Sequence, residues 1–244
     1  MHQTRKIYMT AQNSSPGLVV KGFAPPLKLP QFKLIAFDMD STLINIECID
    51  EIADAVGLKA EVAAITEATM RGEIADFKTS LRRRVALLKG VSVQDMERVY
   101  AERLQLNPGA TELITASKNA GMTTLLVSGG FTFFADRVAK RLGIDFVKSN
   151  ELDISNGLLT GSLVNQSWGD ICDGEEKRKT LLQTCALLGI EASQSIAVGD
   201  GANDLLMMGA AGLSVAYHAK PKVREQAMVA INEGGLDRLL EVLI

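Results

Sequence analysis

The stretch "FDMDST" (residues 37–42) decides the fold, because it joins an apolar run to a cluster of acidic and hydroxyl side chains. Asp38 and Asp40 stand one residue apart, directly after the apolar run "KLIAF" (33–37). Two like charges this close raise the free energy of a folded site unless a positive charge offsets them. The stretch therefore predicts a buried strand followed by a site that needs a cation.

Five further apolar runs resemble the first, since they are rich in Val, Ile and Leu and alternate little with polar residues. Such runs are typical of parallel strands that are covered on both faces. Helical segments separate them, and this alternation favours a doubly wound α/β fold. The predicted strands are 33–37, 122–127, 144–147, 195–198, 213–216 and 228–231, and the predicted helices between them include 109–119, 131–142, 174–189 and 202–210.

Two segments break the alternation, and a third precedes it. Between the first strand and Pro108 no convincing strand occurs, so residues 45–106 are predicted to form a small helical cap from segments 48–56, 59–70, 76–89 and 93–104. Apolar runs flank Asn156-Gly157, a strong hairpin signal, which predicts a flap at about 149–165.

Residues 1–31 hold four of the six prolines and are interpreted as an irregular arm, although "GLVV" (17–20) is compatible with a short strand. The α/β core is then expected to comprise residues 32–44 and 107–244.

Composition excludes several classes of protein. Hydrophobic residues make up 47% of the 244 residues and charged residues 23%, as in ordinary globular proteins. The net charge of −3 and the lack of a basic stripe argue against nucleic-acid binding. No apolar run approaches the roughly 18 residues of a membrane span, and the N-terminus lacks the apolar core of a secretory signal. Three cysteines outside metal-ligand pairs indicate reduced thiols and a cytoplasmic location.

Acidic and small residues follow three of the predicted strands. Asp38 to Thr42 follow the first, Ser128-Gly129-Gly130 the second, and "GDGAND" (199–204) the fourth. Ligands of open α/β sheets bind beyond the carboxyl ends of the strands, so these residues are expected in one cleft. With only two histidines in the chain, a zinc site is hard to build. Carboxylate oxygens without His or Cys partners favour a hard ion, and Mg²⁺ is the expected cofactor.

A nucleophilic carboxylate beside Mg²⁺ indicates phosphoryl transfer, in which the protein mainly positions groups and offsets charge. Ser128 and the glycine N–H groups are candidates to hold the phosphoryl oxygens, since they open a predicted helix whose N-terminus favours an anion. No P-loop motif occurs, so the carboxylate itself is the candidate nucleophile and would form an aspartyl-phosphate. A second positive charge is expected from "GEEKRKTL" (174–181), where the residues leave Lys177 and Lys179 as alternatives.

Four motifs in order resemble those of the haloacid dehalogenase superfamily: "DMDST", "VSGG", Lys177 and "VGDGAND". The resemblance covers about residues 33–240 and implies a Rossmann-like parallel sheet with a cap after the first strand. Longer stretches, such as "FDMDSTLINIECIDEIA" and "LRRRVALLKG", are similar to the phosphoserine phosphatases of that superfamily. That resemblance implies hydrolysis of O-phospho-L-serine, as the last step of serine biosynthesis, by a monomer or homodimer.

The resemblance also implies roles for individual residues. Asp38 would attack phosphorus, and Asp40 would protonate the leaving hydroxyl and then take a proton from the hydrolytic water. Lys177 would tether Asp38 and the phosphate. Mg²⁺ would be held by Asp38, Asp200 and the backbone carbonyl of Asp40, with Asp204 supporting the metal site from behind. Ser128 and Gly129 would bind phosphoryl oxygens, Asn203 would order the neighbouring loop, and Glu47 and Arg84 would hold the ammonium and carboxylate of the substrate.

The periodicity of the third cap helix supports the role of Arg84. At about 100° per residue, Arg84 falls on the apolar side with Leu81 and Leu88, whereas Arg82 and Arg83 fall outside it. Arg seldom lies on such a face unless it is paired, either with a buried partner in the cap or with a bound carboxylate.

Four alternatives stay open. In the first, the substrate is another small phosphomonoester, such as phosphohomoserine, and in the second, the phosphoryl group passes to an alcohol instead of water. A receiver-type phospho-acceptor signalling module also uses a strand-end aspartate with Mg²⁺ and a lysine, but it lacks a counterpart of Asp40 and a large cap. A catalytically silent binding protein is disfavoured by the complete set of motif residues.

Overall fold

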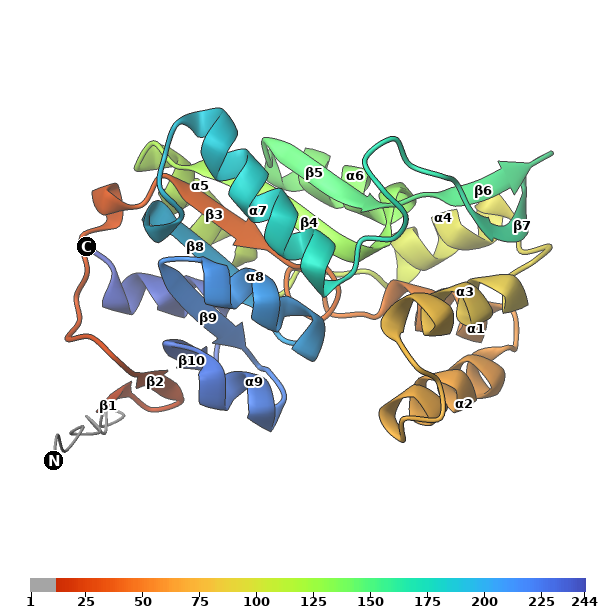
Figure 1. Ribbon diagram of the computed structural model, residues 1–244, viewed down its shortest axis with the longest axis horizontal. Coiled ribbons are helices and arrows are strands. Elements are labelled where there is room, and N and C mark those ends of the chain that lie inside the picture. Colours follow the sequence, from red (N-terminus) through yellow and green to blue (C-terminus); the bar gives the residue numbers. More distant parts are fainter. Residues whose placement is uncertain (1–11) are drawn as a thin grey trace, which may run out of the picture.

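The computed structural model describes residues 12–244, and these fold around an eight-stranded sheet in the order β1-β2-β10-β9-β8-β3-β4-β5 (Figure 1). Each of the last six strands in this order runs parallel to its neighbours within that group. The doubly wound parallel sheet predicted from the sequence is therefore confirmed. The six strands are β10 (Val229–Ile231), β9 (Leu213–Tyr217), β8 (Ser195–Gly199), β3 (Leu34–Phe37), β4 (Thr123–Phe131) and β5 (Phe146–Asn150).

Helices cover both faces of this sheet. Successive residues of a strand point to opposite faces, so each strand contributes side chains to two buried clusters. Ile35 and Phe37 of β3 belong to one buried cluster, and Leu34 and Ala36 belong to the other. The first cluster includes residues of α5 (Ala110–Asn119), α6 (Thr132–Leu142) and η4 (Leu236–Val242). The second includes residues of α7 (Gly174–Leu188), α8 (Leu205–Ala210) and α9 (Pro221–Gln226).

Four helices lie between β3 and α5, and we call them the helical insert. They are α1 (Cys48–Ala55), α2 (Lys59–Met70), α3 (Phe77–Leu87) and α4 (Val93–Glu102), on the right of Figure 1. The Asp76 side chain caps α3 by accepting a hydrogen bond from Thr79 N, and Ser92 and Asp95 form a capping box on α4. The sequence predicted all four helices to within two residues at each end. Their status as a separate cap domain stays a prediction.

The strands β6 (Leu152–Ser155) and β7 (Leu158–Leu163) form the predicted hairpin. Asn156 and Gly157 have φ values of 52° and 76°, as a two-residue turn of a twisted hairpin requires. The hairpin is hydrogen-bonded to the insert, since Gly90 N donates to Leu159 O at 2.8 Å and Leu159 N donates to Val91 O at 2.8 Å. The hairpin is thus attached to the segment between α3 and α4 of the insert.

The N-terminal segment differs from the predicted irregular arm. Residues 12–20 form β1 (Gln12–Ser15) and β2 (Leu18–Val20), and β2 pairs antiparallel with β10. The connecting Pro16-Gly17, with Gly17 at φ 74°, is the signature of a tight turn. The free edge of β10 supplies the hydrogen-bond partners that a sequence pattern does not reveal. Residues 1–11 of the predicted arm lie outside the described residues.

Two strands also differ from their predicted ranges. The strand β4 continues through Ser128-Gly129-Gly130 to Phe131, so the predicted turn is the end of a strand. The strand β5 begins at Phe146, two residues later than predicted. Neither shift changes the edge of the sheet at which the polar residues lie.

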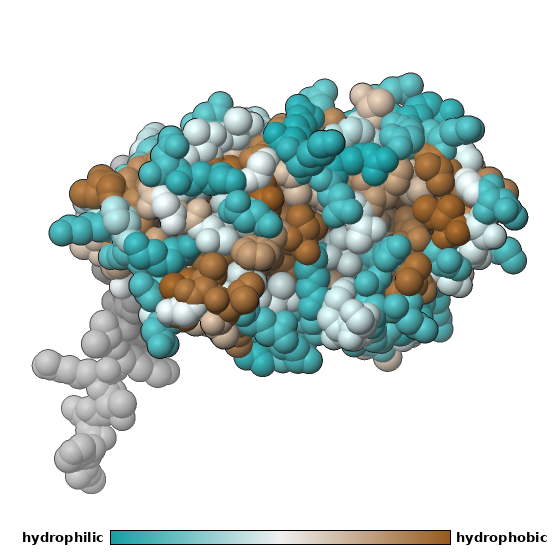
Figure 2. All heavy atoms as spheres, turned by 90° about the horizontal axis from the view of Figure 1, so that it is seen from above, coloured by the Kyte–Doolittle hydropathy of each residue, from teal (hydrophilic) through white to brown (hydrophobic). Residues whose placement is uncertain are grey.

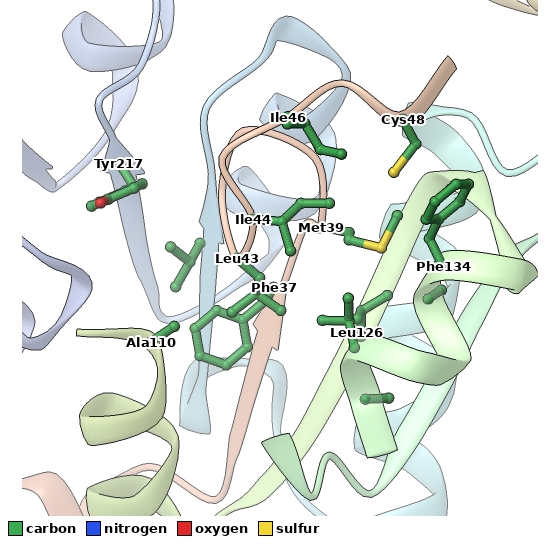
Figure 3. Packing of buried hydrophobic residues seen from close by; sticks show 14 of the residues in the cluster. Phe37, Met39, Leu43, Ile44, Ile46, Cys48, Ala110, Leu126, Phe134 and Tyr217 are labelled. Carbon is green, nitrogen blue, oxygen red and sulfur yellow. The ribbon is translucent and has the colours of Figure 1, made fainter. Parts of the chain in front are cut away.

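The loop after β3 is anchored by its own apolar side chains. Met39, Leu43 and Ile44 are fully buried, and Figure 3 shows them directed into the cluster that contains Leu126 and Phe134. This packing holds the backbone on either side of Asp38 and Asp40 in place. Elsewhere, Figure 2 shows a largely hydrophilic face on which hydrophobic side chains form separate patches. Among residues 12–244, no helix has the length and apolar character of a membrane span.

Candidate active site

A cavity of about 730 Å³ lies where the carboxyl ends of β3, β4 and β8 face the helical insert. Side chains from the strand ends and from α1 and α3 line it together. Among them are Asp38, Asp40, Glu47, Asp50, Arg84, Ser128, Gly129, Asp200, Asn203 and Lys220. The structure thus brings the residues singled out in the sequence to one cavity, except Lys177 and Asp204, which lie beside Asp38 in the protein interior.

Asp38 follows β3 directly and is only 4% exposed. Its Oδ1 accepts a hydrogen bond from its neighbour Met39 N at 2.7 Å and lies 2.7 Å from Lys177 Nζ. Burial and the nearby Asp204 raise the pKa of Asp38 well above its ordinary value, against the opposing effect of Lys177. Asp38 is therefore a fixed, largely dry carboxylate with one cation beside it.

Lys177 lies in α7 and is completely buried. Its ammonium also lies 2.7 Å from Asp204 Oδ1, so two carboxylates share one positive charge. Burial alone would lower the pKa of Lys177, but Asp204 and Asp38 together raise it, so the side chain stays charged. Lys179, the alternative that the residues left open, is exposed and lies 3.8 Å from Glu176. Of these two lysines, Lys177 is the one that contacts Asp38.

Asp204 also holds the backbone of its own loop. Its Oδ2 accepts hydrogen bonds from Asp200 N at 3.2 Å and from Gly201 N at 3.0 Å. A Cβ atom on Gly199 would lie 2.5 Å from Asp204 Cγ, so this approach requires glycine at the end of β8. The carboxylate of Asp200 is thereby aimed at the cavity, where its Oδ1 accepts a hydrogen bond from Thr42 Oγ1 at 3.3 Å.

The three carboxylates of Asp38, Asp200 and Asp204 offer oxygens within 4.8 Å of one another. Asp38 and Asp204 share one buried ammonium, that of Lys177, and the salt bridges among the described residues include none to Asp200. Burial and Asp204 raise the pKa of Asp200 to about 7, which is the mark of a site short of positive charge. An all-oxygen donor set with an excess of negative charge fits a hard divalent cation such as Mg²⁺. Both oxygens of Asp204 already have partners, since Oδ1 accepts from Lys177 and Oδ2 accepts from the loop backbone.

Asp40 lies two residues after Asp38, in the loop that follows β3. Burial and the nearby carboxylate of Glu47 raise the pKa of Asp40 to about 7. A Cβ atom on Gly130 would lie 2.8 Å from Asp40 Oδ2, so only glycine leaves room for this carboxyl. A carboxyl with this pKa exchanges protons readily near neutral pH, as a general acid and base must.

The end of β4 offers donors to an anion. Ser128 is buried, and its Oγ accepts a hydrogen bond from Gly130 N at 2.9 Å, which leaves the hydroxyl hydrogen free to donate. A Cβ atom on Gly129 would lie 3.0 Å from the ring of Phe77 and 3.3 Å from Cys172 O. The strand end is therefore packed tightly between α3 and the segment before α7, with its backbone at the cavity surface.

Glu47 and Arg84 lie on the insert side of the cavity. Glu47 Oε1 accepts a hydrogen bond from Ser41 Oγ at 2.7 Å. Arg84 is half-buried, while Arg82 and Arg83 are exposed, as the helical periodicity predicted. Arg84 Nε is buried and has no hydrogen-bond partner among the described residues. The two side chains present opposite charges to whatever fills this end of the cavity.

Three residues near the site were given no individual role from the sequence. Thr42 donates to Asp200, as noted above. Asn150 joins two segments, since its Nδ2 donates to Gly129 O and its Oδ1 accepts from Cys172 N, both at 2.8 Å. Asp50 lines the cavity and has a buried oxygen, Oδ1, without a partner. Their spacing carries no signal, because each contact joins residues brought together only by folding or lies one helical turn from a stronger candidate.

Comparisons with known proteins agree with this geometry. The model of the family haloacid dehalogenase-like hydrolase matches residues 35–209. A phosphoserine phosphatase from Polaromonas sp. (strain JS666) is 73% identical over 229 residues, which are 94% of this chain and 97% of that protein. Two solved structures each share 38% identity and a TM-score of 0.79 with this chain, over 87% of it and 99% of theirs. One is a phospho-aspartyl intermediate analogue of phosphoserine phosphatase, and the other a substrate-bound phosphoserine phosphatase complex.

These matches settle the class of the protein. A matched hydrolase family rules out the receiver-type signalling module that the sequence left open. Within that family, the 73% identity with a phosphoserine phosphatase, over 97% of that protein, identifies the narrower group. The chain belongs to the phosphoserine phosphatases of the haloacid dehalogenase-like hydrolase family.

Proposed function

We propose that this protein hydrolyses O-phospho-L-serine to L-serine and phosphate through an aspartyl-phosphate on Asp38, with Mg²⁺ as cofactor. The observation that carries the proposal is the pairing of a buried, lysine-bound carboxylate with a second carboxyl, Asp40, whose pKa is raised to about 7. The names of the relatives support the choice of substrate. The phospho-aspartyl analogue of the 38% identical phosphatase supports the covalent intermediate.

In the first step the carboxylate of Asp38 attacks phosphorus, and the bond from phosphorus to the serine oxygen breaks. Lys177, 2.7 Å from Asp38 Oδ1, favours the ionised form of the nucleophile and holds its position. The Ser128 hydroxyl and the Gly129 N–H lie at the cavity surface, where they can donate to the phosphoryl oxygens. Donors placed before the reaction stabilise developing charge without reorganisation at the moment of transfer.

Asp40 moves the protons. In its protonated form it donates to the leaving oxygen of serine, so that a neutral hydroxyl departs. In its ionised form it then accepts a proton from the water that attacks the aspartyl-phosphate. A pKa of about 7 makes both forms available near neutral pH. Gly130 secures the position of this carboxyl, because any side chain there would collide with it.

The metal site is proposed at Asp38, Asp200 and the backbone carbonyl of Asp40. When bound there, Mg²⁺ supplies positive charge to the phosphoryl oxygens. Asp204 acts behind these groups by holding Lys177 and the N–H groups of residues 200 and 201. Asn203, in the same loop, lines the cavity and orders its wall.

The insert is proposed to recognise the amino-acid part of the substrate. Glu47 would accept hydrogen bonds from the ammonium, and Arg84 would bind the carboxylate through its forked nitrogens. Both line the same cavity as Ser128 and Gly129 at the end of β4. A phosphomonoester without these charges would lose both contacts while keeping the reacting centre unchanged.

A panel of phosphomonoesters tests the substrate. With Mg²⁺, kcat/KM should be highest for O-phospho-L-serine and lower for phosphohomoserine and p-nitrophenyl phosphate. A different best substrate would reject phosphoserine while leaving the phosphatase mechanism standing. Added alcohols should not increase the release of the leaving group, because phosphate passes to water; accumulation of a new phosphomonoester would instead support transfer.

A cytoplasmic location and a monomeric or homodimeric state belong to the same proposal. Cys48, Cys172 and Cys185 are all free and buried, as expected in a reducing compartment. Light scattering of the purified protein decides between one and two copies, and a larger assembly would contradict the expectation.

A further inference from the structure

Asp50 is a charged side chain that the mechanism above leaves without a task. It lies in the first turn of α1 and lines the cavity about one helical turn after Glu47. An acid in the first turn of a helix is ordinary, because it complements the helix dipole. Asp50, however, has an oxygen, Oδ1, that is hidden from water and has no hydrogen-bond partner among the described residues. Leaving a buried acceptor unpaired is unfavourable, so a hydrogen-bond donor is expected to pair with this oxygen.

The matching donor is on α3. Arg84 Nε is buried, lacks a partner among the described residues, and lines the same cavity as Asp50. Of the neighbouring charges, Arg84 is the largest that lowers the pKa of Asp50, against the burial that raises it. Asp50 in turn outweighs Glu47 and Asp40 in opposing the burial that lowers the pKa of Arg84. Yet no ion pair of 4.0 Å or less joins the two side chains in this structure.

We infer that Asp50 is a positioning residue that engages Arg84 Nε when substrate binds, and so turns the two outer nitrogens of the guanidinium toward the substrate carboxylate. The inference rests on the proposed function of Arg84. One contact satisfies both orphaned atoms, a donor and an acceptor. It leaves the forked pair of nitrogens for bidentate recognition, the geometry in which Arg binds carboxylates most strongly.

An alternative task for Asp50 would be to join Glu47 in holding the ammonium of the substrate. The two tasks differ in which substrate group depends on Asp50. Two analogues separate them, since O-phosphoethanolamine keeps the ammonium and lacks the carboxylate, whereas 3-phosphoglycerate keeps the carboxylate and has a hydroxyl in place of the ammonium. Each is measured as a competitive inhibitor of p-nitrophenyl phosphate hydrolysis, so its own turnover is not needed.

The test compares Asp50→Asn with the parent enzyme and with Glu61→Gln, which neutralises an exposed carboxylate on α2. Asp50→Asn should raise Ki for 3-phosphoglycerate and KM for phosphoserine about tenfold, the scale of a coupling of 1.4 kcal/mol between touching groups. Ki for O-phosphoethanolamine and kcat for p-nitrophenyl phosphate should stay within about twofold, and Glu61→Gln should change none of these values.

The double variant Asp50→Asn/Arg84→Ala completes a double-mutant cycle. If Asp50 acts through Arg84, Asp50→Asn should cause no further rise in Ki or KM once Arg84 is removed. Arg84→Lys keeps the charge but lacks both the Nε donor and the forked pair of nitrogens. It should reproduce the pattern of Asp50→Asn, even if that variant folds poorly. A raised Ki for O-phosphoethanolamine alone, an equal rise for all ligands, no rise at all, or additive losses in the double variant would each overturn the inference. Failure of the parent enzyme to prefer phosphoserine would instead overturn the proposed function.

Discussion

Replacing Lys177 by Met removes the positive charge that lies between two buried carboxylates. The Lys177 ammonium lies 2.7 Å from both Asp38 and Asp204, and the side chains of Lys177 and Asp204 are fully buried. Removing one partner of a buried ion pair destabilises a protein by about 3–5 kcal/mol, because the remaining charge is uncompensated. The variant should therefore lose a large part of a stability that is typically about 5–15 kcal/mol.

Urea unfolding in the presence of a chelator measures this loss, since the chelator leaves only the charges of the protein. The matched control is Lys179→Met on the same helix, where the lysine is exposed and lies 3.8 Å from Glu176. An exposed pair of this kind contributes at most about 1 kcal/mol. Lys177→Met should also abolish phosphatase activity, whereas Lys179→Met should keep it. Equal unfolding free energies for the two variants would refute the account of Lys177 as the central counter-charge.

Three further predictions concern the site, the core and a partly exposed ion pair. Gly130→Ala should reduce kcat for phosphoserine by about a hundredfold, because a Cβ atom 2.8 Å from Asp40 Oδ2 displaces the acid; an unchanged kcat would contradict the role of Asp40. Phe134→Ala should lower the free energy of unfolding by about 3–5 kcal/mol, since this ring is fully buried, and a loss below that of a surface substitution would be the opposing result. Partial burial would raise the pKa of Asp145, but hydrogen bonds from Lys118 and Thr124 lower it below its ordinary value. Asp145→Asn should therefore destabilise the protein at pH 7, and the deficit should shrink as the pH falls below about 4; a constant deficit would contradict the shift.

Patterns of short range predicted most of the fold. The apolar runs marked the parallel strands, and the helical periodicity placed Arg84 on the inner side of α3 and Arg82 and Arg83 on the outer side. "GLVV" (17–20) was compatible with a short strand, but its pairing with β1 was missed although Pro16-Gly17 is a turn signal, because the prolines of residues 1–31 favoured an irregular arm. Its pairing with β10 joins residues more than two hundred positions apart, and no local pattern encodes that contact.

The sequence likewise predicted some features of the functional site and not others. Spacing and residue type predicted an acidic cleft at the strand ends, and a resemblance was needed to choose Lys177 over Lys179. The structure supplies the physical reason for that choice, since only Lys177 lies between Asp38 and Asp204. Asp204 was expected to support the metal, and its nearest partners are Lys177 and the loop backbone. Asp50 escaped notice because an acid in the first turn of a helix has an ordinary explanation, and only its buried, unpaired oxygen sets it apart.

The most direct test of the central claim is a rapid acid quench of the enzyme with O-phospho-L-serine labelled in its phosphate, followed by peptide mapping. The account predicts that labelled phosphate appears on Asp38 within a single turnover, and that it disappears as free phosphate is released. The Asp38→Asn variant should acquire no label while it keeps the fold. Label on a different residue, or serine released in the first turnover with no phosphate bound to the protein, would contradict an aspartyl-phosphate on Asp38.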